Sequence, residues 1–339
     1  MEKFKANCLP VLIGSLPIND HDEAISIVYK YTPDIPLWVQ LPIYKQEGMI
    51  AQFLPGLPSS DNEEIAQFYE EYLAVSEGQA DINNSRFAMS YDYAKGFFVF
   101  LDYIKNLSKP PIALKGQITC PITLGMGTND ENGRAVYYND ILKDPLIKLV
   151  SMKAKWQAKK LSQFGLPVII FLDAPAIAGF GSSAYISISR EEIVSAIEEV
   201  ISAIHSEGAL VGVHICANAD WSIVLNSSAD IVSFDAYSFF DRFILYPKEI
   251  KAFLERGSIL AWGIVPTGRP EFIEKENTDS LFEKFNELLS QITKIGISQS
   301  KIFSQSLITP SCGTGSLSID NATKVLRLTR ELSDRLRGV

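Results

Sequence analysis

Short apolar runs alternate with helical patterns along the whole sequence, and this alternation is what most restricts the fold. Most of the runs are apolar at nearly every position, which is typical of parallel strands that are buried on both faces. Each run is followed by a segment with helical spacing of its apolar residues. Eight such runs are present, at residues 9–14, 36–42, 111–116, 168–173, 210–216, 230–235, 258–265 and 302–308.

Eight strand–helix units in a chain of 339 residues predict a (β/α)8 TIM barrel that spans residues 1–339 as a single domain. The segment from about 45 to 110 is polar and helical, and we expect it to be an insertion with connecting helices after the second strand. A doubly wound sheet is the alternative fold. It is less favoured because the first strand is followed by Gly14-Ser-Leu-Pro, which is not a dinucleotide-binding loop.

The composition excludes several classes of protein. The net charge is −9 and no basic face is evident, so a nucleic-acid partner is not expected. No apolar run is long enough to cross a membrane, and no signal-peptide core precedes Pro10. We therefore expect a cytoplasmic protein. The four cysteines are widely scattered, so a disulfide framework is not expected either.

The expected active site follows from the barrel itself, because chemistry in such folds takes place at the carboxyl ends of the strands. Polar or metal-binding residues occur at or just after nearly every predicted strand end. In chain order they are Ser15, Gln40, Gln117, Thr119, Asp173, His214, Cys216, Asp235, Thr267 and Cys312.

Four of these residues predict a metal site. His214 and Cys216 are two positions apart on one strand, so their side chains point to the same side. Imidazole and thiolate ligands suit zinc, and Asp235 and Cys312 are at nearby strand ends. Three firm ligands and one displaceable carboxylate are typical of a catalytic zinc ion. A cysteine on a strand can instead be a small core residue.

The remaining cysteines and histidines are expected to be structural residues that bind no ligand. Cys8 and Cys120 are expected to fill the core, and His21 and His205 are expected to lie on helix surfaces.

The ordered motifs resemble the C-terminal catalytic half of cobalamin-independent methionine synthase, and more broadly its superfamily with uroporphyrinogen decarboxylase and the methylcobamide:coenzyme M methyltransferases. The His214-x-Cys216 pair, the strand end at Asp235 and the late Cys312-Gly are similar to the zinc ligands of the family. The other matching segments, in order, are Ile13-Gly-Ser15-Leu-Pro, Gly116-Gln-Ile-Thr-Cys-Pro-Ile-Thr, Leu172-Asp173-Ala-Pro-Ala176 and Gly263-Ile-Val-Pro-Thr267.

The chain departs from this family at several positions. Asp235 stands where the family has a glutamate, and Ala174 replaces the acidic residue after Asp173. Ala51 and Gln52 occupy the stretch where a family glutamate helps to hold the amino group of homocysteine. The N-terminal half of methionine synthase has no counterpart in this sequence.

The resemblance implies a zinc-dependent methyltransferase, of the kind that serves methionine biosynthesis, acting on homocysteine or another small thiol. The methyl donor would be a methylated corrinoid protein, a methylated folate or a small methylated compound. Zinc would deprotonate the thiol, whose ordinary pKa is about 8.5, and the substrate would take the open position or displace Asp235. The substrate contacts would come from Ser15, Gln117, Asp173 and Thr267.

Two other functions remain open from the sequence. A decarboxylase of a tetrapyrrole would have no metal at this site. A corrinoid-binding or thiol-binding protein without turnover would bind zinc and transfer no methyl group.

Overall fold

The computed structural model describes residues 4–182, 185 and 187–339, and its centre is a curled parallel β-sheet. Within the described residues the sheet has seven strands in the spatial order β1-β7-β6-β5-β4-β3-β2. Sequence neighbours from β2 onward are therefore also neighbours in space. This order has no reversal point, which rules out the doubly wound alternative. The strands are β1 (Leu9–Pro10), β2 (Leu114–Thr119), β3 (Val168–Asp173), β4 (Leu210–Ile215), β5 (Ile231–Phe234), β6 (Ile259–Val265) and β7 (Ser306–Pro310).

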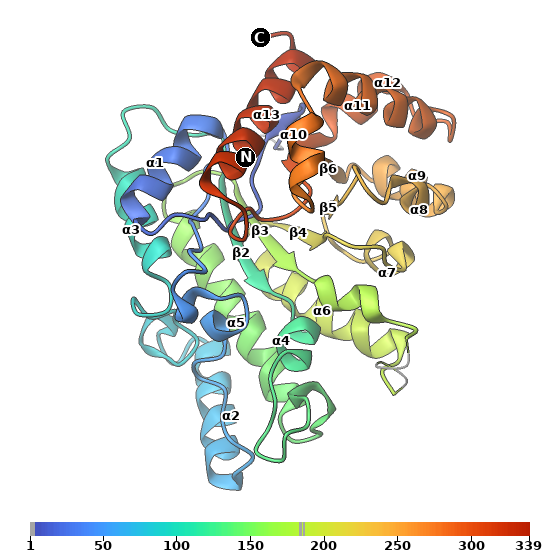
Figure 1. The fold of residues 1–339 in the computed structure, drawn as a ribbon. Coiled ribbons are helices and arrows are strands. Elements are labelled where there is room, and N and C mark those ends of the chain that lie inside the picture. The colour runs from blue at the N-terminus through green and yellow to red at the C-terminus, as the bar shows by residue number, and fades with distance from the viewer. Residues whose placement is uncertain (1–3, 183–184, 186) are drawn as a thin grey trace.

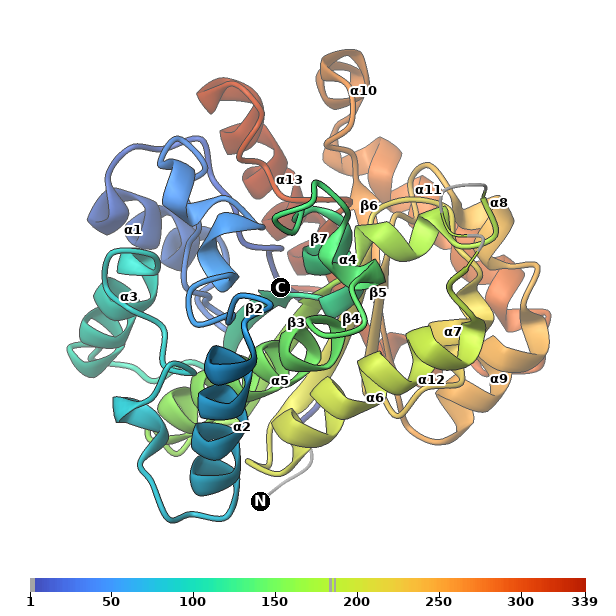
Figure 2. The ribbon, with the colours of Figure 1, turned by 90° about the horizontal axis from the view of Figure 1, so that it is seen from below.

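Helices surround the outside of the sheet, as the two views in Figure 1 and Figure 2 show. Most connections between consecutive strands contain at least one helix, as parallel strands require. None of the helices in the described part of the chain is both long and apolar enough to span a bilayer. The helices are α1 (His21–Tyr31), α2 (Asn62–Ser76), α3 (Lys95–Lys105), α4 (Pro121–Met126), α5 (Lys143–Ser162), α6 (Arg190–His205), α7 (Trp221–Leu225), α8 (Phe240–Phe243), α9 (Pro247–Glu255), α10 (Pro270–Lys275), α11 (Thr278–Thr293), α12 (Gln299–Ser304) and α13 (Ile319–Arg337).

The predicted second strand, residues 36–42, does not form a regular strand. It makes two isolated parallel bridges, one between Gln40 and Ser15 and one between Leu37 and Lys115. The segment thus contacts both edges of the sheet, just beyond β1 on one side and at β2 on the other. Prolines at both ends of the segment, Pro36 and Pro42, lack the backbone N–H that a regular ladder needs.

The core has two parts, which follow the alternation of side chains along each strand. A large cluster fills the space between the sheet and the helices and includes Trp38 and Trp262. A smaller cluster includes Ile169, Phe171 and Ile231 together with residues of β1, β6 and β7. On β3, Phe171 and Asp173 lie two and four positions after Ile169, so they point to the same face of the sheet as the smaller cluster.

Several predicted boundaries were wrong. β2 begins at Leu114 rather than 111, and β7 begins at Ser306 rather than 302. Residues 302–304 belong instead to α12, whose N-terminus is capped by the Ser298 side chain. The first strand, β1, ends at Pro10 rather than 14. The segment 45–110 contains α2, α3 and the 3-10 turns η1 (Lys45–Glu47), η2 (Ala51–Phe53) and η3 (Ile82–Asn84).

Candidate metal centre

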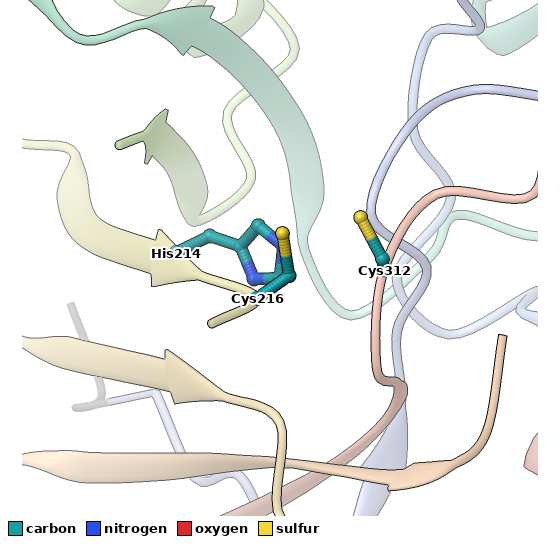
Figure 3. Close-up of side chains that lie close together, drawn as sticks. All are labelled: His214, Cys216 and Cys312. Atoms are coloured by element: carbon teal, nitrogen blue, oxygen red, sulfur yellow. The ribbon is translucent and has the colours of Figure 1, made fainter. Parts of the chain in front are cut away.

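Three predicted ligands converge at the carboxyl end of the sheet. The ligand atoms of His214, Cys216 and Cys312 all lie within 4.8 Å of one another. His214 is in β4, Cys216 directly follows β4, and Cys312 is in the loop after β7. Figure 3 shows the imidazole and the two sulfur atoms facing the same space from these two segments. The sequence prediction that these three side chains meet is confirmed.

Strand register brings the neighbouring polar residues to the same place. Asp173 pairs with His214 between β3 and β4, and His214 pairs with Ser233 between β4 and β5. Gly212 is two residues before His214, and a Cβ atom there would collide with the ring of Phe171. The absence of a side chain at Gly212 therefore lets β3 and β4 pack closely beneath the cluster.

The imidazole of His214 is oriented and has one nitrogen without a partner. His214 is 3% exposed, and its Nδ1 atom lies 2.9 Å from the Oγ atom of Ser233. Its Nε2 atom is buried with no hydrogen-bond partner among the described residues. Such atoms are rare in folded proteins because an unmatched buried polar group is costly. With its proton on Nδ1, the ring presents the lone pair of Nε2 toward the two sulfur atoms, as metal ligation requires.

The two thiols of the cluster differ sharply in acidity. The thiol of Cys312 donates a hydrogen bond to Cys216, and this contact lowers the pKa of Cys216 to about 4. The same contact and burial raise the pKa of Cys312 well above its usual value. The pair thus holds a thiolate beside a thiol.

The other two cysteines behave as core residues. Both are fully buried, and burial raises the pKa of the Cys8 and Cys120 thiols to about 12. A thiol that is hard to ionise is a poor ligand and a poor nucleophile. Their predicted role as core fillers is confirmed.

Asp173 is beside the cluster and has an oxygen to which no described residue donates a hydrogen bond. The residue is 9% exposed, and its Oδ1 atom is buried without a hydrogen-bond partner. Burial raises the pKa of Asp173 to about 6, while the charges of His214 and Lys115 oppose the rise. This oxygen is available to a hydrogen-bond donor on a ligand.

Asp235, the fourth predicted ligand, is not part of the group of atoms within 4.8 Å of one another. Its Oδ1 atom accepts a hydrogen bond of 2.8 Å from the backbone N–H of Ser238, so the carboxylate closes the turn after β5. Burial raises the pKa of Asp235 to about 6. Ligation by Asp235 stays a prediction.

A cavity of about 460 Å³ opens beside the cluster. Six of the predicted site residues line it: Ser15, Gln40, Asp173, His214, Cys216 and Cys312. The cavity therefore joins residues from β3, β4, the loop after β7 and the segment 36–42.

Three further predicted residues are engaged elsewhere. Gln117 is fully buried, and its Nε2 atom donates to the carbonyl of Trp38 at 2.9 Å. Thr119 donates to the carbonyl of Met49 at 2.6 Å, and the Thr267 hydroxyl lies 2.9 Å from the Oγ atom of Ser311. The structure does not bring these three side chains to the cavity wall, so the substrate contacts of Gln117 and Thr267 stay predictions.

The sequence analysis missed several lining residues as members of the site, among them Glu47 and Met49, which both follow the segment 36–42. The Oε1 atom of Glu47 lies 2.7 Å from Nε2 of His21, and its Oε2 atom accepts from the N–H of Leu41 at 2.9 Å. His21 is only 4% exposed, so its predicted surface position was wrong. His205, 36% exposed at its side chain, is near the surface as predicted.

Comparison of the sequence with protein-family models and with curated proteins finds no match.

Proposed function

We propose that the protein is a zinc-dependent methyltransferase that methylates a small thiol in the cytoplasm. The observation that carries the proposal is the unpartnered Nε2 atom of His214, which lies within 4.8 Å of two cysteine sulfur atoms. One nitrogen and two sulfur ligands are a donor set typical of catalytic zinc, which leaves a position open for substrate. The adjoining cavity of about 460 Å³ is large enough for a small ligand.

We further propose that the segment 36–42 occupies the position of an eighth strand and completes a (β/α)8 barrel. Support comes from its backbone contacts on both sides. The N–H of Leu16 donates to the carbonyl of Gln40 at 3.1 Å, and the N–H of Lys115 donates to the carbonyl of Pro36 at 3.0 Å.

The chemistry of a bound zinc ion is to act as a Lewis acid that favours the ionised form of a thiol. Within the protein, Ser233 holds the His214 ring in one orientation, and the hydrogen bond between Cys312 and Cys216 keeps one sulfur ionised. Asp173 offers its free oxygen to a polar group of the acceptor, and Ser15 also lines the cavity. The reaction joins the methyl carbon to the thiol sulfur, breaks the bond between that carbon and the donor atom, and releases the thiol proton.

The methyl donor in this proposal is a methylated corrinoid protein or a methylated folate, and the acceptor is homocysteine-like or another small thiol. Cys216 and Cys312, which line the cavity, are both partly exposed, so a reactant in the cavity can reach the sulfur-lined end.

Metal content of the purified protein tests this proposal. We expect about one zinc ion per chain in the wild type and a loss of zinc in Cys216→Ser, Cys312→Ala and His214→Ala, because each change removes one of the three ligand atoms. Asp235→Ala should have a smaller effect. Cys120→Ala is the matched control, since this thiol is buried outside the cluster and should keep zinc.

Two outcomes contradict the proposal. Full zinc occupancy in His214→Ala or Cys312→Ala would show that the site is elsewhere. No zinc in the wild type, even after incubation with zinc, would favour the metal-free decarboxylase instead. If zinc is present, methylcobalamin and methylfolate should then be assayed as donors to a panel of thiols.

A further inference from the structure

We propose that the acceptor thiol carries no negatively charged group. This inference rests on the proposed function and narrows its acceptors to neutral or cationic small thiols, which excludes homocysteine because homocysteine carries a carboxylate. Among the described residues that line the cavity, the only charged side chains besides the cysteines are two carboxylates, Asp173 and Glu47. The two positive charges of a bound metal ion would be offset by the two cysteine thiolates. A carboxylate or sulfonate on the acceptor would therefore be buried without a cationic partner, which is strongly unfavourable.

Lys115 is a buried basic residue whose charge acts on Asp173, although burial lowers its pKa to about 7, and its amino group is already engaged. Lys115 is fully buried, and its Nζ atom donates to the carbonyl of Ile13 at 2.5 Å and to Oε1 of Gln117 at 3.2 Å. It also lies 4.5 Å from the centre of the Phe171 ring. Lys115 is not part of the cavity wall. It offsets the charge of Asp173 from inside the sheet and does not reach a ligand.

Both carboxylate oxygens of Glu47 already accept hydrogen bonds within the protein. One of its oxygens is bound to His21 and the other to the N–H of Leu41, and the residue is 2% exposed. It contributes acidic character to the wall, and its partner His21 lies behind it, outside the lining.

Asp173 also disfavours a negatively charged acceptor. Its Oδ1 atom is an acceptor without a donor, so the free energy of binding improves with any ligand that brings an N–H or O–H group. A second negative charge close to Asp173 is repelled. The rest of the wall includes Ile13, Pro42 and Met49, which suit a short hydrocarbon chain.

The test uses protein in which cobalt(II) replaces zinc, because its visible spectrum changes when a thiol reaches the metal. The spectrum reports binding without any methyl donor. Three thiols with the same two-carbon spacer are titrated: 2-mercaptoethanol, 2-aminoethanethiol and 2-mercaptoethanesulfonate. We expect the neutral and the cationic thiol to bind at least about tenfold more tightly than the sulfonate, because only the sulfonate buries an unpaired negative charge.

A designed variant with a positive charge in the cavity tests the inference in the opposite direction. Met49 lines the cavity and is 38% exposed, so a lysine can replace it with its ammonium group near the mouth. We expect Met49→Lys to tighten binding of the sulfonate by about tenfold relative to the neutral thiol. Met49→Leu, the matched control without charge, should keep the preference of the wild type.

The possible failures are distinguishable. If the sulfonate binds wild-type protein as tightly as 2-mercaptoethanol does, the inference about charge is overturned and the proposed function stands. If cobalt binds but no thiol alters its spectrum, the proposed function fails and the inference fails with it.

Discussion

The Nδ1 atom of His214 lies 2.9 Å from the Oγ atom of Ser233, its register partner on the neighbouring strand. This contact fixes the ring so that Nε2 faces Cys216 and Cys312. Both residues are buried, at 3% and 0% exposure, so water does not compete for the bond. The ligand is thus held in position before any metal arrives.

We expect Ser233→Ala to weaken zinc binding by about tenfold, because residues that orient a metal ligand typically contribute this much to affinity. Competition with a chromophoric chelator measures the change. Ser306→Ala is the control, since this buried serine on β7 bonds to Trp262 and lies away from the cluster. It should lower the free energy of unfolding and leave zinc affinity unchanged. Equal affinity in the wild type and Ser233→Ala would show that the contact has no role.

The buried carboxyl of Asp235 makes stability depend on pH. Its pKa is about 6 in the folded protein, against about 3.9 for an unfolded aspartate. Between these values the folded state binds more protons than the unfolded state, so the free energy of unfolding falls as pH rises from about 4 to 6. Below about pH 4 the penalty is absent, and above about pH 6 it is fully present.

Asp235→Asn removes this ionisation and keeps an oxygen that can accept from Ser238. We expect Asp235→Asn to gain free energy of unfolding relative to the metal-free wild type. This gain should be larger at pH 7 than at pH 4, by up to about 3 kcal/mol. Urea unfolding at the two pH values measures the difference. If the stability difference between variant and wild type is the same at both pH values, burial does not raise the pKa of Asp235.

The loop that carries Cys312 lies directly on Ser15. The hydroxyl of Ser15 accepts from the N–H of Gly315 at 3.2 Å, and a Cβ atom on Gly313 would collide with this hydroxyl. We expect Gly313→Ala to cost about 1–2 kcal/mol of unfolding free energy. In a Ser15→Ala background the added cost should be smaller, because the colliding oxygen is gone. Additive losses in this double-mutant cycle would contradict the contact.

The buried hydrogen bond between His21 and Glu47 should contribute to stability because it satisfies a carboxyl oxygen that water does not reach. We expect His21→Ala to cost about 2–3 kcal/mol, because it leaves a buried carboxyl oxygen without a partner. Glu47→Gln keeps an acceptor for the N–H of Leu41 and should cost less. Chemical denaturation compares the two variants, and a larger loss in Glu47→Gln would be contrary to this expectation.

The strands and the cluster were predictable where the signal is local. The run from 168 to 173 is bounded by Pro167 and a small-residue loop, and β3 has these same limits. His214, Cys216 and Cys312 were predicted to meet because parallel strands of one sheet end at the same edge, and their ligand atoms do meet.

One error has a local cause: Ile302 and Phe303 are apolar like a strand, but capping by the nearby Ser298 side chain places them in α12. Other errors arose where a residue far along the chain decides the environment of a side chain. His21 has the polar surroundings of a surface residue, and only the fold brings Glu47 against it. Thr267 follows a strand as expected, yet its hydroxyl is taken by Ser311 from another loop. Periodicity along the sequence contains no information about such distant partners.

The position of Cys312 after β7, the last strand of the sheet to be synthesised, sets an order of events. His214 and Cys216 emerge together on β4, but two donors alone hold zinc weakly. The third donor arrives only when β7 pairs with β6 and carries its loop across to β4. In the proposed zinc site, metal loading would therefore be a late step that ties the final strand to the middle of the sheet, and incomplete chains would lack tightly bound zinc.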